Sequence, residues 1–411
     1  MPELAPETRK SAVRILFITI FLDLLGFGIM IPQIPFFAKM CHAGGSVIGM
    51  VGAVYSLLQF AMAPFWGRVS DRIGRRPVIL IGLCGAGIAY LVFGASLKLA
   101  ALTGLSPVPF LIGSRAFAGF FNANIATAQA YMADLSEGND RAAAMGLVGA
   151  AFGMGFVMGP VISAGISTAT GSPVLPFYFA ALCELGCFLW ALRVLPETRV
   201  PGEKLAADPI SARRLALDLI PAGPLQLTMA AILLSTLGMA GMENTLGLFV
   251  MDSPELHFST NQFAAILLYT GVVIALTQGL AVKKLARRLS ESRLLVVGAT
   301  AMIFGLGLIP LATTTPVIYG LAGLVCFGYG LVSPSLSSLT SKLAPEAVRG
   351  ELLGIGQSMS ALGRIIGPLV AGYLYEKVSH GATYYVAGAF SAVCTVVAIR
   401  LDRRVAGSEH A

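Results

Sequence analysis

The chain has 411 residues, of which 56% are hydrophobic and only 12% are charged, and its mean hydropathy is +0.80. A soluble domain carries about 25% charged residues, so this composition excludes an ordinary soluble protein. The apolar residues form blocks of about twenty or more, which is the length of helix that crosses a hydrocarbon core of about 30 Å. We therefore expect an integral membrane protein with many spans.

Glycines, prolines and charge clusters divide the chain into twelve apolar segments. Only helices and closed barrels satisfy their backbone hydrogen bonds in lipid, and these segments lack the alternating polarity of barrel strands. The first segment contains Asp23 and has no signal-peptide pattern, so we expect a retained span. The prediction is an all-α polytopic membrane protein whose twelve transmembrane helices cover residues 15–38, 46–66, 78–98, 108–133, 143–166, 175–195, 225–250, 260–282, 293–312, 316–341, 351–375 and 381–400.

The distribution of lysine and arginine indicates the orientation. If both termini are cytoplasmic, the cytoplasmic segments hold 23 of the 28 basic residues and the external loops hold three. The positive-inside rule favours this orientation. The net charge of +7 is therefore explained by topology, and nucleic-acid binding is not indicated. The other two basic residues, Arg115 and Arg364, lie within predicted spans.

The segment 196–224 is the longest polar stretch and separates six spans from six. It has too few apolar residues to build a core, so we interpret it as a cytoplasmic linker between an N-terminal half, residues 1–195, and a C-terminal half, residues 225–411. The fifth spans of the two halves share a pattern at an offset of 208 residues, in which Arg141, Gly146, Gly155, Gly159 and Pro160 recur as Arg349, Gly354, Gly363, Gly367 and Pro368. Two six-helix pseudo-repeats are typical of a secondary transporter that binds substrate near the midplane and works by alternating access.

The loop after the second span, GRVSDRIGRRP at residues 67–77, has a glycine, an aspartate four positions later, and then Arg, Gly and a basic pair. It resembles the loop signature of the major facilitator superfamily. The segments LDLLGFGIMIPQIPFF (22–37), GSRAFAGFFNANIATAQAYMAD (113–134), GFVMGPVISAG (155–165) and LPETR (195–199) are similar to motifs of its twelve-helix drug/proton antiporter branch, particularly the tetracycline-efflux transporters. The resemblance covers nearly the whole chain. It implies proton-driven antiport across a bacterial cytoplasmic (inner) membrane, and it names no substrate.

The charged loop has two interpretations. Its arginines can simply anchor a tight turn at the cytoplasmic surface. An acid among four arginines has no such use, and Asp71 can pair with Arg72, Arg75 or Arg76 or approach exposed N–H groups at a helix N-terminus. The resemblance implies a cytoplasmic latch between the halves that holds the outward-facing state. The expected latch residues are Gly67, Asp71, Arg72, Gly74, Arg75 and Arg76.

Charged side chains within spans require an explanation, because each costs at least about 2.5–3.5 kcal/mol in the bilayer. Asp23 and Arg115 are at comparable depths, so they either form a buried ion pair between the first and fourth helices or provide a carboxylate that titrates during transport. Glu184 and Glu243 are further candidates for proton coupling, and the sequence does not rank the three acids. Arg364 either binds an anionic substrate group or pairs with Glu243.

A polar stripe on the fourth span indicates a substrate cavity or a contact with another helix. The stripe consists of Arg115, Gly119, Asn122, Ala126 and Gln129. A mixture of polar, aromatic and methionine side chains on the first span suits an amphipathic organic ligand, and helix packing accepts it as well. The expected cavity residues are Phe27, Met30, Gln33, Gln59, Asn122, Gln129, Gln357 and Arg364.

The fifth span carries Gly155, Gly159 and Pro160, which allow close helix approach and interrupt one backbone hydrogen bond. Packing alone explains such a pattern, whereas the resemblance implies a bend that closes the cavity and limits leak. The six cysteines and the histidines show no metal-ligand spacing, so we expect neither a metal site nor a disulfide framework.

These observations predict a secondary active transporter that exports amphipathic organic compounds or drugs in exchange for protons, with proton and substrate competing for an acidic site. The alternatives are a symporter or facilitator for a small metabolite or organic anion, and a receptor or scaffold without transport. The sequence has no GxxxxGK[ST] loop for an ATP-driven pump and no nucleophile-base arrangement for an enzyme. We expect a monomer whose partners are a small-molecule substrate and the lipid bilayer, with the proton as coupling ion and no cofactor.

Overall fold

The structure is a computed structural model that describes residues 6–30, 33, 37, 40–41, 44–135, 140–198, 223–345 and 349–409. Every regular element within these ranges is helical, and no strand occurs in them. The side chains of some helical residues, Gln129, Arg141 and Phe156 among them, lie outside the description.

All twelve predicted spans correspond to helices. Those before the linker are α1 (Pro6–Met30), α3 (Gly45–Ile73), α4 (Arg75–Thr103), α5 (Val108–Phe121), α6 (Ile125–Asp134), α7 (Asp140–Thr170) and α8 (Leu175–Val194). Those after it are α10 (Pro224–Asp252), α11 (Thr260–Leu276), α12 (Val282–Leu285), α13 (Glu291–Leu308), α14 (Thr315–Leu343), α15 (Arg349–Lys377) and α16 (Ala382–Glu409). In the described part of the chain, nine helices are long and apolar enough to cross a membrane on length and composition alone.

Two predicted spans are built from more than one helix. The fourth consists of α5 and α6, which are joined by a 3-10 turn at Asn122–Asn124. The eighth consists of α11 and α12, which are joined by a π-helical segment at Thr277–Ala281. Hydrophobic length locates a span but does not detect such a change of helix type, because a short 3-10 or π segment leaves the apolar composition unaltered.

The first helix begins earlier than predicted, at Pro6 rather than at residue 15. The added turns are polar, and Arg9 donates a hydrogen bond from Nε to the carbonyl of Leu135 at 2.8 Å. Because hydropathy detects only the apolar part of a helix, it misses polar turns that extend the helix past the hydrocarbon region.

Local signals explain several helix ends. Ser259 and Gln262 form a capping box at the start of α11, and Ser290 accepts a hydrogen bond from the N–H of Arg293 at the start of α13. The helix α4 ends at Thr103 and is followed by Gly104, whose φ of 70° is left-handed and suits glycine.

Contacts between residues divide the chain into two units. One comprises residues 1–43 and 54–204, and the other comprises residues 44–53 and 205–411. The first ten residues of that second group include the start of α3, which packs on α15. There the carboxylate of Glu376 accepts a hydrogen bond from the N–H of Ser46 at 3.0 Å, and the backbone of Gly45 lies against that of Gly372.

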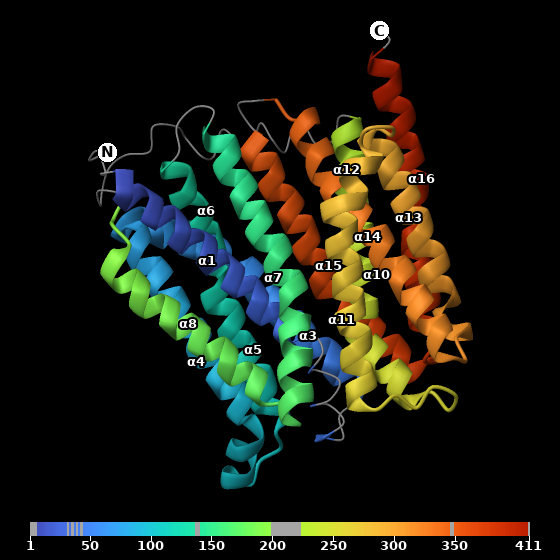
Figure 1. Ribbon diagram of the computed structural model, residues 1–411, viewed down its shortest axis with the longest axis horizontal. Helices are drawn as coiled ribbons and strands as arrows, with labels where there is room; N and C mark the ends of the chain where they lie inside the picture. Colours follow the sequence, from blue (N-terminus) through green and yellow to red (C-terminus); the bar gives the residue numbers. More distant parts are fainter. Residues whose placement is uncertain are drawn as a thin grey trace. The chain divides into compact units, whose positions relative to one another are not determined.

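Corresponding helices pack in corresponding ways within the two units (Figure 1). In the first unit α1 packs on α7 and α8, and α4 packs on α5 and α8. In the second unit α10 packs on α15 and α16. A Cβ on Gly159 of α7 would meet the backbone of α1, and a Cβ on Gly367 of α15 would meet that of α10. The sequence repeat at an offset of 208 therefore corresponds to a repeated helix-helix contact.

Candidate functional site

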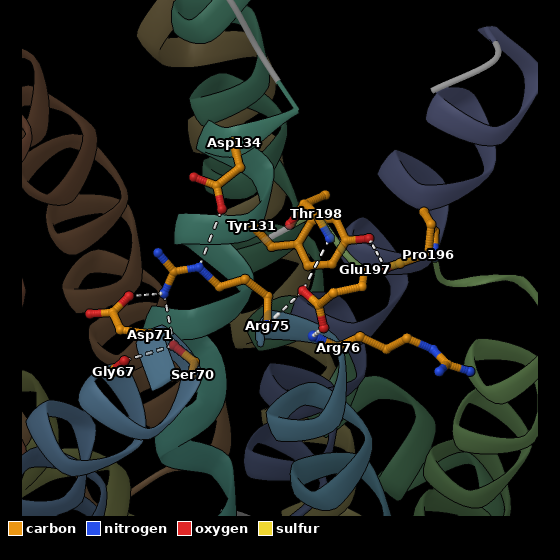
Figure 2. Close-up of polar contacts among 10 residues, drawn as sticks. All are labelled: Gly67, Ser70, Asp71, Arg75, Arg76, Tyr131, Asp134, Pro196, Glu197 and Thr198. Atoms are coloured by element: carbon orange, nitrogen blue, oxygen red, sulfur yellow. Dashed lines mark hydrogen bonds and ion pairs between the residues drawn. The ribbon is translucent and has the colours of Figure 1, made fainter. Parts of the chain in front are cut away.

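The charged segment 67–77 is not the loop that the sequence predicted, because its residues form the end of α3 and the start of α4 with only Gly74 between them. It is organised around Arg75, which is buried (Figure 2). Its Nη1 lies 2.9 Å from Oδ1 of Asp71 and donates to Oγ of Ser70 at 2.7 Å, while its Nε donates to Oδ2 of Asp134 at 3.2 Å. One guanidinium thus connects the end of α3, the start of α4 and the end of α6. A planar guanidinium suits this position because its donors point in several fixed directions.

Glu197, which follows α8, caps the N-terminus of α4. Its carboxylate oxygens accept the N–H groups of Arg75 at 2.9 Å and Arg76 at 3.1 Å (Figure 2). The first N–H groups of a helix have no partner inside it, and the helix dipole favours a negative charge there. The cap position itself is Gly74, which has no side chain to supply this contact.

The conformation of Gly74 makes room for that cap. Its φ of 104° and ψ of 158° belong to a region that is essentially restricted to glycine, and a Cβ would meet the carboxylate of Glu197. The sequence analysis identified the LPETR motif at residues 195–199 but assigned no role to Glu197. The signal that could have found it is an acid shortly after the sixth span, at the cytoplasmic level of an uncapped helix start.

The other expected latch residues have different environments. Arg76 donates a hydrogen bond from its side chain to the carbonyl of Leu192 at 2.7 Å, the carbonyl of Gly67 accepts one from Ser70 at 2.7 Å, and Arg72 is exposed. Each of these contacts joins residues of the first unit. The expected pairing of Asp71 with Arg75 is present, while the role of the loop as a latch between the halves stays a prediction.

Asp23 and Arg115 are both buried, but they do not form the ion pair that was one of the two expectations. Neither carboxylate oxygen of Asp23 has a hydrogen-bond partner among the described residues. The guanidinium carbon of Arg115 instead lies 4.2 Å from the ring centre of Tyr55 and 5.9 Å from that of Phe27. The positive charge of Arg115 is therefore stabilised by aromatic rings. The carboxylate oxygens of Asp23 accept no hydrogen bond from any described residue.

The hydroxyl of Tyr55 on α3 binds two side-chain amides, one from α3 itself and one from the fourth span. It accepts hydrogen bonds from the side-chain amides of Gln59 at 3.2 Å and Asn122 at 3.3 Å, and a Cβ on Gly119 would meet the backbone of Tyr55. The polar stripe of the fourth span therefore faces α3 at these positions. Sequence reasoning missed Tyr55 because a single tyrosine in an apolar helix gives no periodic signal.

The remaining expected cavity residues are divided between the two units, with Gln33 and Met30 in the first and Gln357 and Arg364 in the second, and the cavity stays a prediction. Gln33 is buried and donates hydrogen bonds to the hydroxyls of Ser163 and Ser167 on α7, both at 2.9 Å. These two bonds hold the Gln33 side chain against α7. Met30 is buried, Gln357 is exposed and Arg364 is half-buried. The side chain of Gln129 lies outside the described residues.

The two glutamates within spans belong to different units. Glu184 on α8 is 1% exposed, and neither of its carboxylate oxygens has a hydrogen-bond partner in the described ranges. Glu243 on α10 is partly buried, and Arg364 on α15 lies close enough to interact with it electrostatically. Of the charged residues within predicted spans, the second unit thus has Glu243 and Arg364, whereas the first unit has two acids, Asp23 and Glu184, and Arg115.

The glycines of the predicted bend lie against α1. A Cβ on Gly155 would meet the backbone of Phe21, and a Cβ on Gly159 would meet that of Gly28. The helix α7 continues through Pro160. The close approach of these helices is thus explained by small residues, whereas closure of a cavity by this helix stays a prediction.

Comparison with known proteins places the chain in a family. The model of the Major Facilitator Superfamily matches residues 16–368 and 327–410. Tetracycline resistance protein, class C, of Escherichia coli is 30% identical over 94% of this chain and 96% of that protein, and major facilitator superfamily domain-containing protein 10 of Bos taurus is 30% identical over 94% and 91%. The crystal structure of the human organic anion transporter MFSD10 (TETRAN) superposes with a TM-score of 0.65 at 25% identity, covering 96% of this chain and all of that one. The family model and these relatives, which cover 94% of the chain, show that the chain belongs to the major facilitator superfamily of membrane transporters.

Proposed function

We propose that this transporter exports amphipathic organic compounds in exchange for protons. The observation that carries the proposal is the environment of Asp23, which is fully buried in a membrane-spanning helix and has no hydrogen-bond partner for either carboxylate oxygen among the described residues. A carboxylate in that environment is costly unless it binds a proton or a cation. Asp23 therefore binds a proton in one step of the cycle and releases it in another.

The groups around Asp23 suit an organic substrate. Phe27 and Tyr55 have their ring centres 5.2 Å apart, and the guanidinium of Arg115 lies over the tyrosine ring. Aromatic faces with a few polar groups favour flat, amphipathic molecules. Release of the proton changes the charge beside these rings, and this change gives the substrate different affinities in the two protonation states.

Two relatives support a drug substrate. The class C tetracycline resistance protein of Escherichia coli is one, and multidrug resistance protein 2 of Bacillus subtilis, 28% identical over 90% of each chain, is another. We propose by this analogy that the substrate is a drug-like compound and that the protein works in a bacterial cytoplasmic membrane. Both termini face the cytoplasm, the working unit is a monomer, and the proton is the coupling ion without a further cofactor.

The test uses everted membrane vesicles from cells that express the chain. An acid interior is imposed, and uptake of ethidium and of tetracycline is followed before and after nigericin collapses the pH gradient. We expect uptake of at least one compound that nigericin abolishes and that Asp23→Asn eliminates, while Glu255→Gln, which removes an exposed carboxylate, behaves as wild type. Uptake that persists without the gradient would show facilitated transport instead.

Transport of an organic anion is the second candidate. It is favoured by the half-buried Arg364 beside Glu243 in the second unit and by the likeness to the human organic anion transporter MFSD10. An arginine next to a substrate path provides a site for a carboxylate or sulfonate group. Fluorescein uptake into the same vesicles, lost in Arg364→Gln and unaffected by nigericin, would favour this function over drug/proton exchange.

A further inference from the structure

Asp23 on α1 and Glu184 on α8 lie at the same depth in the first unit. The two helices pack against each other, and their register is set by Thr19 and Cys187, whose Oγ1 and Sγ atoms are 3.8 Å apart. Asp23 lies one turn beyond Thr19 on α1, and Glu184 lies about one turn before Cys187 on α8. Because the first and sixth spans run in opposite directions, both steps lead the same way along the membrane normal.

The two carboxylates interact with each other and are buried without a hydrogen-bond partner among the described residues. Each is close enough to the other to interact electrostatically, and Asp23 is 0% and Glu184 is 1% exposed. None of their four oxygens has a hydrogen-bond partner among the described residues. Two ionised carboxylates that are close enough to interact repel each other, and burial removes the water that would screen the repulsion.

Polar groups from three neighbouring helices are linked to this pair through Tyr90, which interacts electrostatically with both acids and with Arg115. Tyr90 of α4 is 1% exposed, and its hydroxyl lies against Gly26, one turn from Asp23, with no hydrogen-bond partner in the described part of the chain. Arg115 of α5 supplies the positive charge, and Tyr55 of α3 interacts electrostatically with both Tyr90 and Arg115.

The other titratable groups on the helices around α1 do not change the charge of this cluster. Cys183 and Cys187 lie beside Glu184 on α8. The described spans of α6 and α7 carry charged residues only at their cytoplasmic ends, where Asp134 binds Arg75. The cluster therefore contains two acids and one permanent cation. It is neutral with one proton bound and carries one negative charge with none.

We propose that Asp23 and Glu184 form one proton-binding unit that exchanges a single shared proton, and that the substrate exchanged for it is a monovalent organic cation. This inference rests on the proposed function. A shared proton donates a hydrogen bond from one carboxyl to the other, and the remaining negative charge is balanced by Arg115. Loss of the proton to the cytoplasm leaves one negative charge beside Phe27 and Tyr55, which favours a cation. One proton moves in for each monovalent cation moved out, so the exchange transfers no net charge.

The first test needs no substrate. Purified protein in lipid vesicles is titrated, and the carbonyl stretch of protonated carboxyls is followed by infrared difference spectroscopy. We expect Asp23→Asn and Glu184→Gln each to move the titration midpoint of the remaining carboxyl by about one pH unit or more, because strongly interacting sites titrate as a pair. Glu255→Gln is the control. Unchanged midpoints in both single variants, or no titrating buried carboxyl in the wild type, would overturn the pair.

Two further measurements complete the test. If a single variant does not fold, the exchanged variant Asp23→Glu with Glu184→Asp keeps both carboxyls. We expect this variant to retain the titrating carbonyl band. Loss of the band from the folded variant would contradict the proposal. In proteoliposomes, we expect one proton to be transported for each ethidium cation exported. The rate of export should not change when a membrane potential is set with valinomycin. Sensitivity to that potential would overturn the one-for-one exchange. Export indifferent to the pH gradient would instead refute the proposed function, and the infrared titration would still decide on the pair.

Discussion

Replacing Gly74 by alanine tests whether the Glu197 cap stabilises the cytoplasmic end of the first unit. Gly74 has a φ of 104° and a ψ of 158°, and a Cβ added there would meet the carboxylate that caps α4. The substitution therefore has two effects. It forces alanine into a region that is almost exclusive to glycine, and it displaces Glu197 from the N–H groups of Arg75 and Arg76.

The size of each effect follows from the structure. Backbone strain in this region costs about 1–3 kcal/mol. Loss of two hydrogen bonds to a charged acceptor adds about 1–2 kcal/mol, a value reduced because Glu197 is partly exposed. We expect Gly74→Ala to lower the free energy of unfolding by about 2–5 kcal/mol. Gly104→Ala is the matched control, because Gly104 has a φ of 70° and no atom within 4 Å of an added Cβ, so it reports strain alone.

The assay combines thermal unfolding in detergent with amide hydrogen exchange of the peptide that contains Arg75 and Arg76. Gly74→Ala should unfold at a lower temperature than Gly104→Ala, and these two amides should exchange at least about tenfold faster than in the wild type, since 1.4 kcal/mol corresponds to a factor of ten. Glu197→Gln should accelerate the same amides without adding backbone strain. Equal unfolding temperatures and unchanged exchange in all variants would refute the capping argument.

Three other predictions concern separate contacts. Tyr55→Phe keeps the ring under the guanidinium but removes the hydroxyl that two side-chain amides share, and we expect a loss of about 1–3 kcal/mol in unfolding free energy, visible as a lower unfolding temperature. Gly159→Ala should destabilise the protein by about 1–3 kcal/mol because its methyl group meets the backbone of α1, whereas Gly165→Ala, with no atom within 4 Å, should not; equal expression and stability of the two would contradict the close packing. The carboxyl pKa of Glu376 is lowered from 4.5 to about 2, mainly by hydrogen bonds from Ser46, so its contribution to stability is complete above 4.5 and declines as the pH falls toward 2. Thermal unfolding against pH should show this decline in the wild type and a weaker one in Glu376→Gln.

The helices could be predicted from the sequence because a segment that spans a bilayer must be apolar and must satisfy its own backbone hydrogen bonds. All twelve predicted spans contain helices, including the two that the structure divides at Asn122–Asn124 and Thr277–Ala281. The repeated Gly and Pro residues indicated a duplication, and Gly159 and Gly367 lie against the first helix of their own halves. Glycine has no side chain, so the close approach of two helices at a glycine can be predicted from the residue type alone.

The partners of the charged residues were less accessible. Helix rise placed Asp23 and Arg115 at comparable depths, and an ion pair was one reasonable consequence. In the structure the guanidinium lies on Tyr55 instead, because the rotation of α5 and the position of α3 decide which face it meets. Rotation of a helix about its axis depends on side-chain packing with its neighbours, and a hydrophobic pattern that is nearly uniform around the helix does not define it.

By itself the sequence determined where the chain is helical and which residues are small enough for helices to touch, because in lipid each backbone group must find its partner within its own segment. Only the tertiary structure decided that Glu197 caps α4, that Arg115 stacks on Tyr55, and that Asp23 and Glu184 lie at the same depth. These are contacts between residues more than fifty positions apart in the chain. They depend on the registers and rotations of packed helices, which composition and spacing leave open.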